Sequence, residues 1–318
     1  MAPSQEISDA IIVGGSHAGL SAALTLYRAN HTSLIFDDGT PRNAQAEHVH
    51  MVPAWGDKSP NALREKSRAE LKETGLVRFV DRRLVSAAKL EDGTFEVVDD
   101  KGERWKGRKI VLAFGVEEKH PDIPGYSENY GKLIYHCLFC FGYEKRGSEV
   151  AGVLATGPLG NPSHAPIFAA DALRFAKRVK LYTQGDGKLA EEVSKVLAEK
   201  QLSNAIEVDN RKLVRISKAA ENDNDEKLRL EFDAGTDDVV AFMGHAPDSP
   251  VDPTLPKQLG CEMDPKAGIK VSPIWYSTTA PGVFAAGDCC SPLRSVLTGM
   301  SAGSCAGVGV ARHLAGFS

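Results

Sequence analysis

The stretch DAIIVGGSHAG, residues 9–19, decides the fold, because in it an apolar run breaks directly into a glycine-rich loop. A helical pattern follows over residues 20–29, so the sequence predicts a strand, a tight turn and a helix. Such a turn directs backbone N–H groups and the positive end of a helix dipole at a pyrophosphate. The G-x-G-x-x-G pattern is imperfect, and a plain strand-to-helix connection is the alternative. The candidate cofactor-binding residues of this loop are Gly14, Gly15, Ser16, His17, Ala18 and Gly19.

A second predicted strand, residues 33–36, supports the nucleotide-binding interpretation. It ends at Asp37, about 20 residues beyond the loop, where a carboxylate accepts hydrogen bonds from an adenosine ribose. Asp38 is the next candidate for this role.

Residues 40–60 have the composition of a functional loop, since Pro, His and Asn are frequent in it. Arg42 and Asn43 near its start are candidate cofactor-binding residues. His50 is a candidate base, because histidine exchanges protons near neutral pH. A surface connection that carries histidines is the alternative interpretation.

The single Cys-x-x-C of the chain, Cys137 and Cys140, lies about halfway along it. Six cysteines in 318 residues are too few for a secreted disulfide scaffold, so this pair is interpreted as catalytic or metal-binding. Zinc needs about four ligands, and no second Cys-x-x-C or His-x₃-His completes a set. We therefore predict a redox-active dithiol and no metal site.

A second strand, turn and helix follows the dithiol, at residues 149–155, 156–162 and 163–177, with another strand at 179–183. The order of these elements again indicates a dinucleotide fold. The residues of the turn argue against phosphate binding there, because Pro158 and Pro162 remove N–H donors from it.

The remaining pattern indicates further elements of the same kind. We predict a helix at 187–201, strands at 206–214, 238–243 and 282–288, a charged turn at 221–226 and a helix at 296–314.

Composition excludes other classes of protein. A net charge of −4 with no run of Lys and Arg argues against a nucleic-acid partner. No apolar run approaches the roughly 18 residues that a membrane helix needs, so we expect a soluble, cytoplasmic protein.

These pieces in this order resemble the low-molecular-weight thioredoxin reductase family nearly end to end. The match rests on the N-terminal loop, the strand end at Gly115, the Cys-x-x-C, and Gly287-Asp288 with the helix after it. The resemblance implies an α/β fold of two Rossmann-like domains, the second inserted in the first. It implies a homodimer, an FAD-binding domain at residues 1–119 and 246–318, and an NADPH-domain-like insert at 120–245 that carries the dithiol.

Carried over from that family, Gly14, Gly19 and Asp37 would hold the ADP half of FAD. Asp288 would hold the ribityl chain, and the backbone around Ser295 and Val296 the edge of the isoalloxazine. Gly115 and Gly287 complete the candidate cofactor-binding residues.

Two departures from the family pattern narrow the expected function. No acidic residue follows Cys140, and the NADPH fingerprint is degraded. Both departures resemble the branch of dithiol oxidases from natural-product clusters that close gliotoxin-type and holomycin-type disulfides. That branch passes electrons from a small-molecule dithiol through the cysteines to FAD and then to O₂, giving H₂O₂.

The roles at the dithiol are assigned by the same resemblance. Cys137 would form the mixed disulfide, and Cys140 would lie over the flavin. His136 and His50 are the candidate bases, because the usual acid is absent. Phe139, Phe141, Trp55 and Met51 either line an apolar substrate pocket or belong to the core.

Two rival functions remain open from the sequence. One is an NAD(P)H-dependent reductase of thioredoxin or a small disulfide, and the other is a flavin redox sensor without turnover. The adjacent thiols Cys289 and Cys290 either form a vicinal disulfide or pack as small residues.

Overall fold

The computed structural model describes residues 7–219 and 226–317 of the chain. These residues form two compact units. The first comprises residues 7–44, 51–117 and 250–317, and the second comprises 45–50, 118–219 and 226–249. The charged turn expected at 221–226 lies almost entirely outside the described residues.

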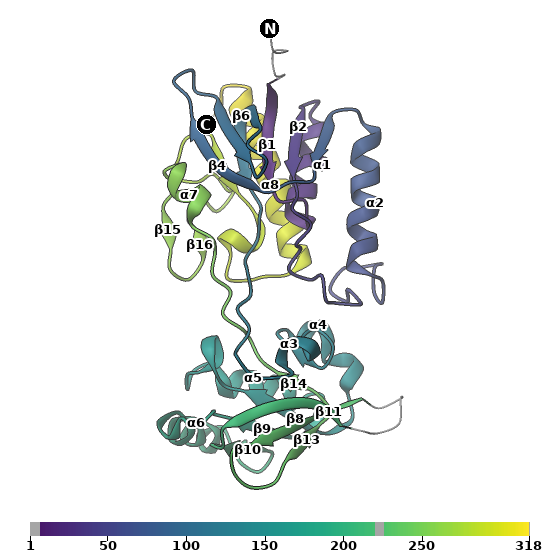
Figure 1. Cartoon of the computed structure of the whole chain (residues 1–318), viewed down its shortest axis with the longest axis vertical. Coiled ribbons are helices and arrows are strands. Elements are labelled where there is room, and N and C mark those ends of the chain that lie inside the picture. The colour runs from purple at the N-terminus through teal and green to yellow at the C-terminus, as the bar shows by residue number, and fades with distance from the viewer. Residues whose placement is uncertain (1–6, 220–225, 318) are drawn as a thin grey trace. The chain divides into compact units, whose positions relative to one another are not determined.

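The first unit is built on a sheet that is seven-stranded in the described part of the chain (Figure 1). Strands β1, β2, β3, β6 and β17 run parallel, while β5 and β4 extend the sheet antiparallel from β6. The strands are β3 (Val77–Val80), β2 (Ser33–Phe36), β1 (Ser8–Val13), β6 (Arg104–Leu112), β5 (Phe95–Asp99), β4 (Leu84–Lys89) and β17 (Val283–Ala285).

Strand β1 is buried on both faces, which is why its sequence is a continuous apolar run rather than an alternating one. Ala10 and Ile12 pack into a cluster with helices α1 (His17–Arg28) and α8 (Val296–Leu314). Ile11 and Val13 point the other way, into a cluster with β5 and helix α7 (Thr254–Gln258). The glycine loop is therefore held at the carboxyl end of a buried strand.

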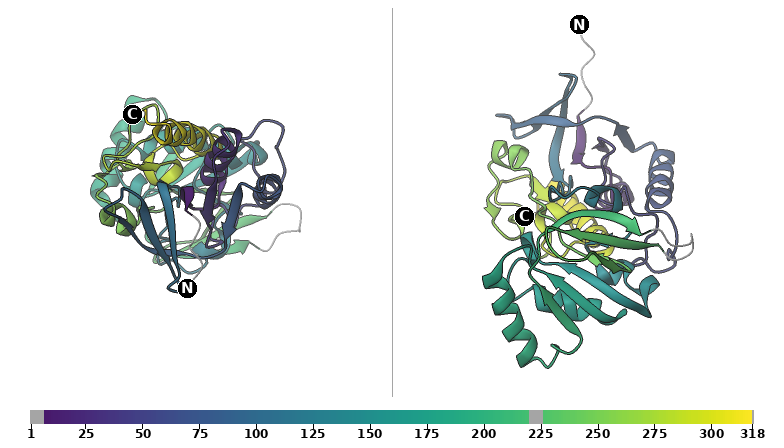
Figure 2. Two further views of the ribbon diagram at one scale, coloured as in Figure 1. Left: turned by 90° about the horizontal axis from the view of Figure 1, so that it is seen from above. Right: turned by 60° about the horizontal axis from the view of Figure 1, so that its bottom comes forward.

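Helices α1 and α8 lie side by side on one face of this sheet, as both views show (Figures 1 and 2). Their backbones come close because α8 presents glycines to α1. A Cβ at position 303 would lie 2.0 Å from the carbonyl oxygen of Ala18. Ser295 fixes the start of α8 through a capping box with Thr298. Helix α2 (Pro60–Glu73), a short 3₁₀ turn η3 (Gly287–Cys290) and the ribbon β15 (Met263–Asp264) with β16 (Gly268–Ile269) complete the unit.

The second unit is built on a parallel sheet in the order β10-β9-β8-β14-β7, whose bounds are β10 (Ile206–Asp209), β9 (Ala176–Tyr182), β8 (Ser148–Leu154), β14 (Met243–Gly244) and β7 (Ile134–Tyr135). Helices α5 (Ala165–Ala172) and α6 (Gly187–Glu199) pack on one side of it. The antiparallel strands β11 (Leu213–Ala219), β12 (Lys227–Phe232) and β13 (Asp238–Val240) pack with the other.

Short helical segments stand at the ends of these strands. They are α3 (Tyr126–Asn129), α4 (Leu138–Phe141), η1 (Tyr143–Lys145) and η2 (Gly157–Leu159). Strand β7 leads directly into the Cys-x-x-C, and η2 occupies the turn after β8. In the described part of the chain, no helix combines the length and the apolar content required to traverse a bilayer.

The α/β fold with Rossmann-type parallel sheets is as predicted, but four element predictions are wrong. The strand expected over 282–288 ends at Ala285, and Gly287 begins the 3₁₀ turn η3. The helix expected over 163–177 ends at Ala172, because Ala176 pairs with Ser148 of β8. The strand expected over 206–214 breaks after Asp209, which accepts the N–H of Arg211 in a turn. The strand expected over 238–243 is two strands, β13 pairing with β12 and β14 lying between β7 and β8.

Candidate active site

The second unit contains the cysteine pair as a disulfide, with an S–S distance of 2.07 Å and a Cα–Cα distance of 5.3 Å. The end of β7 and the single turn of α4 set this geometry. Cys137 is the N-cap residue of α4, and its Sγ accepts the backbone N–H of Cys140 at 3.1 Å. The turn therefore directs a backbone donor at the sulfur of Cys137, an arrangement that favours a thiolate there.

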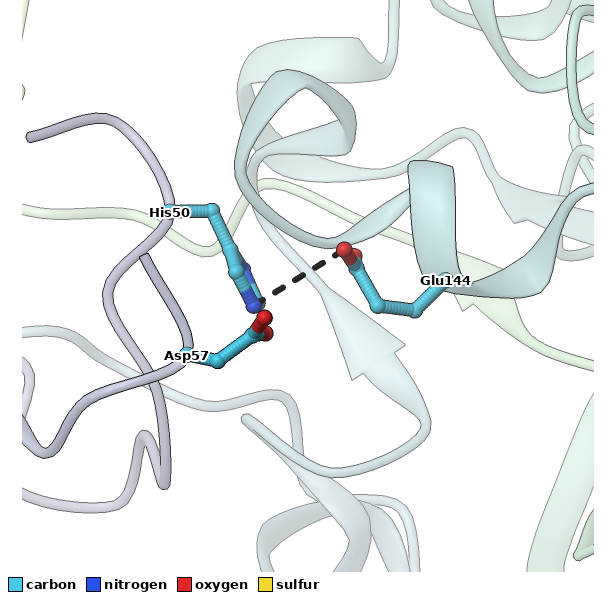
Figure 3. A group of neighbouring side chains, drawn as sticks. All are labelled: His50, Asp57 and Glu144. Atoms are coloured by element: carbon cyan, nitrogen blue, oxygen red, sulfur yellow. Dashed lines mark ion pairs between the residues drawn. The ribbon is translucent and has the colours of Figure 1, made fainter. Parts of the chain in front are cut away.

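Both candidate histidines lie in this second unit. His136 Nδ1 is 3.1 Å from the hydroxyl of Tyr130, and the two rings stack. His50 Nδ1 is 2.6 Å from the carbonyl oxygen of Cys140, and its Nε2 is 3.8 Å from the carboxylate of Glu144 (Figure 3). Tyr130 and Glu144 were missed from the sequence, because a tyrosine and a glutamate near a motif carry no pattern of their own.

The four aromatic and apolar residues considered as a pocket have different surroundings. Phe139 is exposed, at 74%, whereas Phe141 stacks on Tyr135 beside the core. Trp55 and Met51 belong to the first unit, where Trp55 lies under the ammonium groups of Lys58 and Lys66. Of the two sequence neighbours of Cys140, Phe139 therefore faces solvent and Phe141 packs beside the core.

In the first unit, the glycine loop has the geometry of a phosphate cradle. Gly14 adopts a φ of +112°, and a Cβ there would lie 2.3 Å from the carbonyl oxygen of Ala113. A Cβ at Gly19 would lie 1.9 Å from the carbonyl oxygen of Gly14. Ser16 does not cap α1 with its side chain. The loop thus needs glycine at both ends, and its serine leaves the first N–H groups of α1 to another acceptor.

The carboxylates expected at the ribose have distinct partners. Asp37 lies against Gly15, where a Cβ would be 2.3 Å from its carboxylate, and it pairs with Arg68 of α2. Asp38 instead accepts the N–H and hydroxyl of Thr40. Asp37 is therefore the carboxylate that lies next to the glycine loop.

The other predicted cofactor residues also cluster in this unit. Arg42 Nη1 and Asp288 Oδ2 are 2.9 Å apart, which joins the loop after β2 to η3. Gly287 has a φ of +80°, and its Cβ would lie 2.9 Å from that of Ala18. Ser295 is the capped start of α8, followed by Val296, and Gly115 has a φ of +75° with open space around it. Asn43 accepts a hydrogen bond from Arg64 at 2.6 Å.

A buried histidine at the start of α1 tests whether an anionic cofactor fits. His17, the first residue of α1, is 8% exposed, and its Nε2 has no hydrogen-bond partner among the described residues. Burial and the nearby charge of Arg64 lower its pKa to about 4. A neutral ring with an orphaned nitrogen beside an uncapped helix start suits a phosphate-bearing ligand. The residues present therefore fit the ADP half of FAD.

The second strand-turn-helix differs from the first at its helix start. Asn161 Oδ1 accepts the N–H groups of Ser163 at 3.1 Å and His164 at 2.9 Å, and the Asn161 carbonyl accepts that of Ala165 at 3.1 Å. Pro162 and Pro166 have no N–H. From residue 162 to residue 166, each backbone N–H is thus hydrogen-bonded within the chain or is missing because the residue is proline.

The adjacent thiols after Asp288 are free cysteines, so a vicinal disulfide is not formed. Cys289 donates to the carbonyl of Leu112 at 3.3 Å, and Cys290 to that of Gly287 at 3.4 Å. Hydrogen bonding to Cys289 and burial both raise the pKa of Cys290. Both thiols pack as small buried residues.

The fold and this arrangement define a thioredoxin reductase-like disulfide oxidoreductase. Residues 8–303 match the sequence pattern of the family "Pyridine nucleotide-disulphide oxidoreductase", and the chain belongs to that family. The family and its thioredoxin reductase neighbours bind FAD, as predicted. The membership predicted from the sequence, in the gliotoxin-type branch of thioredoxin reductase-like proteins, is confirmed by the relatives.

Three similar proteins illustrate the relationship. "Thioredoxin reductase sirT" of Leptosphaeria maculans is 36% identical over 98% of this chain and 95% of its own. "Thioredoxin reductase aclD" of Aspergillus oryzae is 39% identical over 96% of each chain. The crystal structure of the protein HlmI superposes with a TM-score of 0.86 at 27% identity, covering 98% of this chain and 93% of that one.

Proposed function

We propose that this protein is an FAD-dependent dithiol oxidase that forms an intramolecular disulfide in a sulfur-containing, epidithiodiketopiperazine-like small molecule. The observation that carries this proposal is the occupied start of α5. A nicotinamide dinucleotide binds its pyrophosphate on free N–H groups after the first strand of such a unit. At residues 162–166, the side chain and carbonyl of Asn161 take three of these N–H groups, and Pro162 and Pro166 have none. Electrons therefore enter from the dithiol substrate rather than from NAD(P)H.

The chemistry that the cysteines perform is two thiol–disulfide exchanges. One substrate thiolate attacks Cys137 Sγ, the Cys137–Cys140 bond breaks, and Cys140 leaves as a thiolate. The second substrate thiolate then attacks the substrate sulfur of the mixed disulfide and releases Cys137. The substrate has lost two electrons and two protons, and the cysteine pair has gained them.

The proton transfers fall to the histidines beside the pair. His136, oriented by the hydroxyl of Tyr130, and His50, held on the carbonyl of Cys140, are the proposed bases. A base with a pKa near neutrality accepts a thiol proton and returns it without a large penalty. The backbone N–H of Cys140, which lies on Cys137 Sγ, stabilises that sulfur when it is a thiolate.

FAD, when bound, supplies a two-electron acceptor that O₂ reoxidises with release of H₂O₂. The proposed FAD-binding domain is residues 1–119 and 246–318, and the insert 120–245 carries the dithiol. The residues proposed to hold FAD are the glycine loop 14–19, Asp37, Arg42, Asp288 and the start of α8. As in thioredoxin reductase-like proteins, a homodimer is proposed.

A second candidate is an NAD(P)H-dependent disulfide reductase. It is favoured by the names of the relatives, which call them thioredoxin reductases. The two candidates differ in the source of electrons, so one titration separates them. Under anaerobic conditions, NADPH bleaches the flavin of a reductase, and a dithiol bleaches the flavin of an oxidase while NADPH leaves it yellow.

The deciding experiment measures O₂ consumption and H₂O₂ formation with dithiothreitol as the dithiol. We expect sustained turnover in the wild type and its loss, by at least about 100-fold, in Cys137→Ser and Cys140→Ser. Cys305→Ser, which removes a free thiol elsewhere in the chain, is the control and should keep wild-type rates. Rapid bleaching by NADPH, or dithiol turnover that survives both substitutions, overturns the proposal.

A further inference from the structure

Arg64 of α2 is a buried cation without a carboxylate partner. It is 7% exposed, and its guanidinium donates to Asn43 Oδ1 at 2.6 Å and to Asn61 Oδ1. Both acceptors are neutral amides. Among residues 7–219 and 226–317, no carboxylate lies within ion-pair distance of Arg64. A buried charge left unpaired in this way is costly unless a counter-ion is supplied from elsewhere.

The position of Arg64 indicates what that counter-ion is. Asn43 belongs to the loop after β2, and Arg64 acts electrostatically on His17, the first residue of α1. Burial lowers the pKa of Arg64, while Asp37 and Glu65 raise it, so Asp37 is also within electrostatic reach. Arg64 thus belongs to the same end of the first unit as the glycine loop.

The carboxylates near Arg64 do not form an ion pair with it. Asp37 already pairs with Arg68, which also pairs with the exposed Asp81. His17 is neutral because its pKa is about 4, and the start of α1 adds the positive end of a helix dipole. The buried guanidinium of Arg64, which contacts no carboxylate among the described residues, thus acts on the same helix start as this dipole, and a diphosphate there would interact favourably with both.

We propose that Arg64 binds the pyrophosphate of FAD, and that the orphaned Nε2 of His17 lies in the same phosphate subsite. The inference rests on FAD binding by this family and is independent of the oxidase reaction. A guanidinium suits this role because it offers several N–H donors in a fixed plane. Two of these donors hold the loop residue Asn43 and the helix residue Asn61, and the remaining ones face the cofactor.

The alternative is that Arg64 only fastens Asn43 to Asn61 and shapes the loop. The two roles differ in their dependence on phosphate. A phosphate ligand discriminates ADP from adenosine, whereas a structural clamp affects both alike. Salt also weakens a charge-dependent contact and leaves a neutral one unchanged.

The experiment uses the full-length holoprotein. FAD release is followed by its fluorescence, and FAD is displaced with ADP or with adenosine at several KCl concentrations. We expect Arg64→Gln to weaken FAD about 10-fold or more and to abolish the preference for ADP over adenosine. Arg64→Lys should restore part of both, because the charge returns without the planar fork. Lys72→Gln, which removes an exposed cation from the same helix, should leave both unchanged.

The following outcomes would overturn the proposal or separate it from the proposed function. Equal weakening of ADP and adenosine in Arg64→Gln, or no weakening of either, overturns it. If Arg64→Gln does not fold, Arg64→Lys and the wild type decide. An ADP preference that is insensitive to KCl in the wild type and unchanged in Arg64→Lys also overturns it. Failure of dithiol turnover with an intact ADP preference would reject the oxidase and leave this site standing.

Discussion

Asn161 Oδ1 accepts the backbone N–H of His164 at 2.9 Å, so the turn that leads into α5 is closed by the chain's own side chain. The same oxygen accepts the N–H of Ser163, and the Asn161 amide donates to the carbonyl of Pro158 at 2.9 Å. The Asn161 side chain thus holds together the turn between β8 and α5 through both of its polar atoms.

Replacing Asn161 with alanine should therefore destabilise the protein. The loss should be about 1–2 kcal/mol, because the side chain makes several hydrogen bonds in this turn and each contributes about 0.5–1.5 kcal/mol. Urea unfolding measured at neutral pH checks the difference. Asn204→Ala, at an exposed position, is the control and should change the free energy of unfolding by less than about 0.5 kcal/mol. An Asn161→Ala protein as stable as the wild type would show that these hydrogen bonds do not stabilise the turn.

Asp288 and Arg42 give a prediction about cofactor retention. Asp288→Asn keeps the size of the side chain and removes the charge that holds Arg42 at 2.9 Å. We expect FAD affinity to fall about 10-fold, since a charge-assisted hydrogen bond contributes roughly 1.5–3 kcal/mol. The ratio of flavin to protein absorbance after gel filtration and the FAD dissociation constant measure it. Glu262→Gln breaks the exposed pair with Lys270 and should retain the full flavin content.

The sequence predicts much of this fold, because its strongest patterns are local. Helix α8 begins and ends at Val296 and Leu314 as expected, since Ser295 caps it and the small residues after it have helical spacing. Strand boundaries were wrong where the partner is distant in sequence. Residues 238–243 change from one sheet to another between Val240 and Met243, and only tertiary pairing decides that.

The residues of the candidate site also divide into those that a local sequence pattern predicts and those that only tertiary packing brings into place. A Cys-x-x-C fixes its own geometry through a two-residue spacer, so Cys137 and Cys140 could be named from the sequence. Arg64 could not, because an arginine on a helix rich in Lys, Arg and Glu has the pattern of a solvated surface. Its burial depends on Asn43, which folding brings from the loop after β2.

His245 predicts a loss of stability on acidification. It is 2% exposed, with Nδ1 2.6 Å from the hydroxyl of Tyr126 and Nε2 3.0 Å from that of Thr156. Burial, with a contribution from the charge of His120, lowers its pKa to about 4. The unfolded chain binds this proton near pH 6.5, whereas the folded chain does not until about pH 4. The contribution of neutral His245 to the free energy of unfolding is therefore fully present above pH 6.5 and is lost as the pH falls toward 4.

The expected size at pH 5 is a loss of about 2 kcal/mol relative to pH 7.5 from this residue. Urea unfolding at the two pH values measures the total loss, and His245→Gln should reduce it by about that amount. Asn204→Ala, which replaces an exposed residue without a titratable group, is the control and should leave the pH dependence as in the wild type. An unchanged pH dependence in His245→Gln would show that another group carries it.

Two glycines of α8 give opposite predictions for the same substitution. A Cβ at Gly303 would lie 2.0 Å from the carbonyl oxygen of Ala18, whereas one at Gly299 would meet only the Ala18 Cβ, at 3.9 Å. Gly303→Ala should therefore push α8 from α1 and lower the free energy of unfolding by about 1–3 kcal/mol. Gly299→Ala should raise it by about 0.5–1 kcal/mol, because alanine loses less backbone entropy in a helix. Thermal unfolding of both variants, with flavin content recorded for each, makes the comparison. Equal effects at the two positions would mean that the close approach of α1 and α8 does not depend on the missing side chain at Gly303.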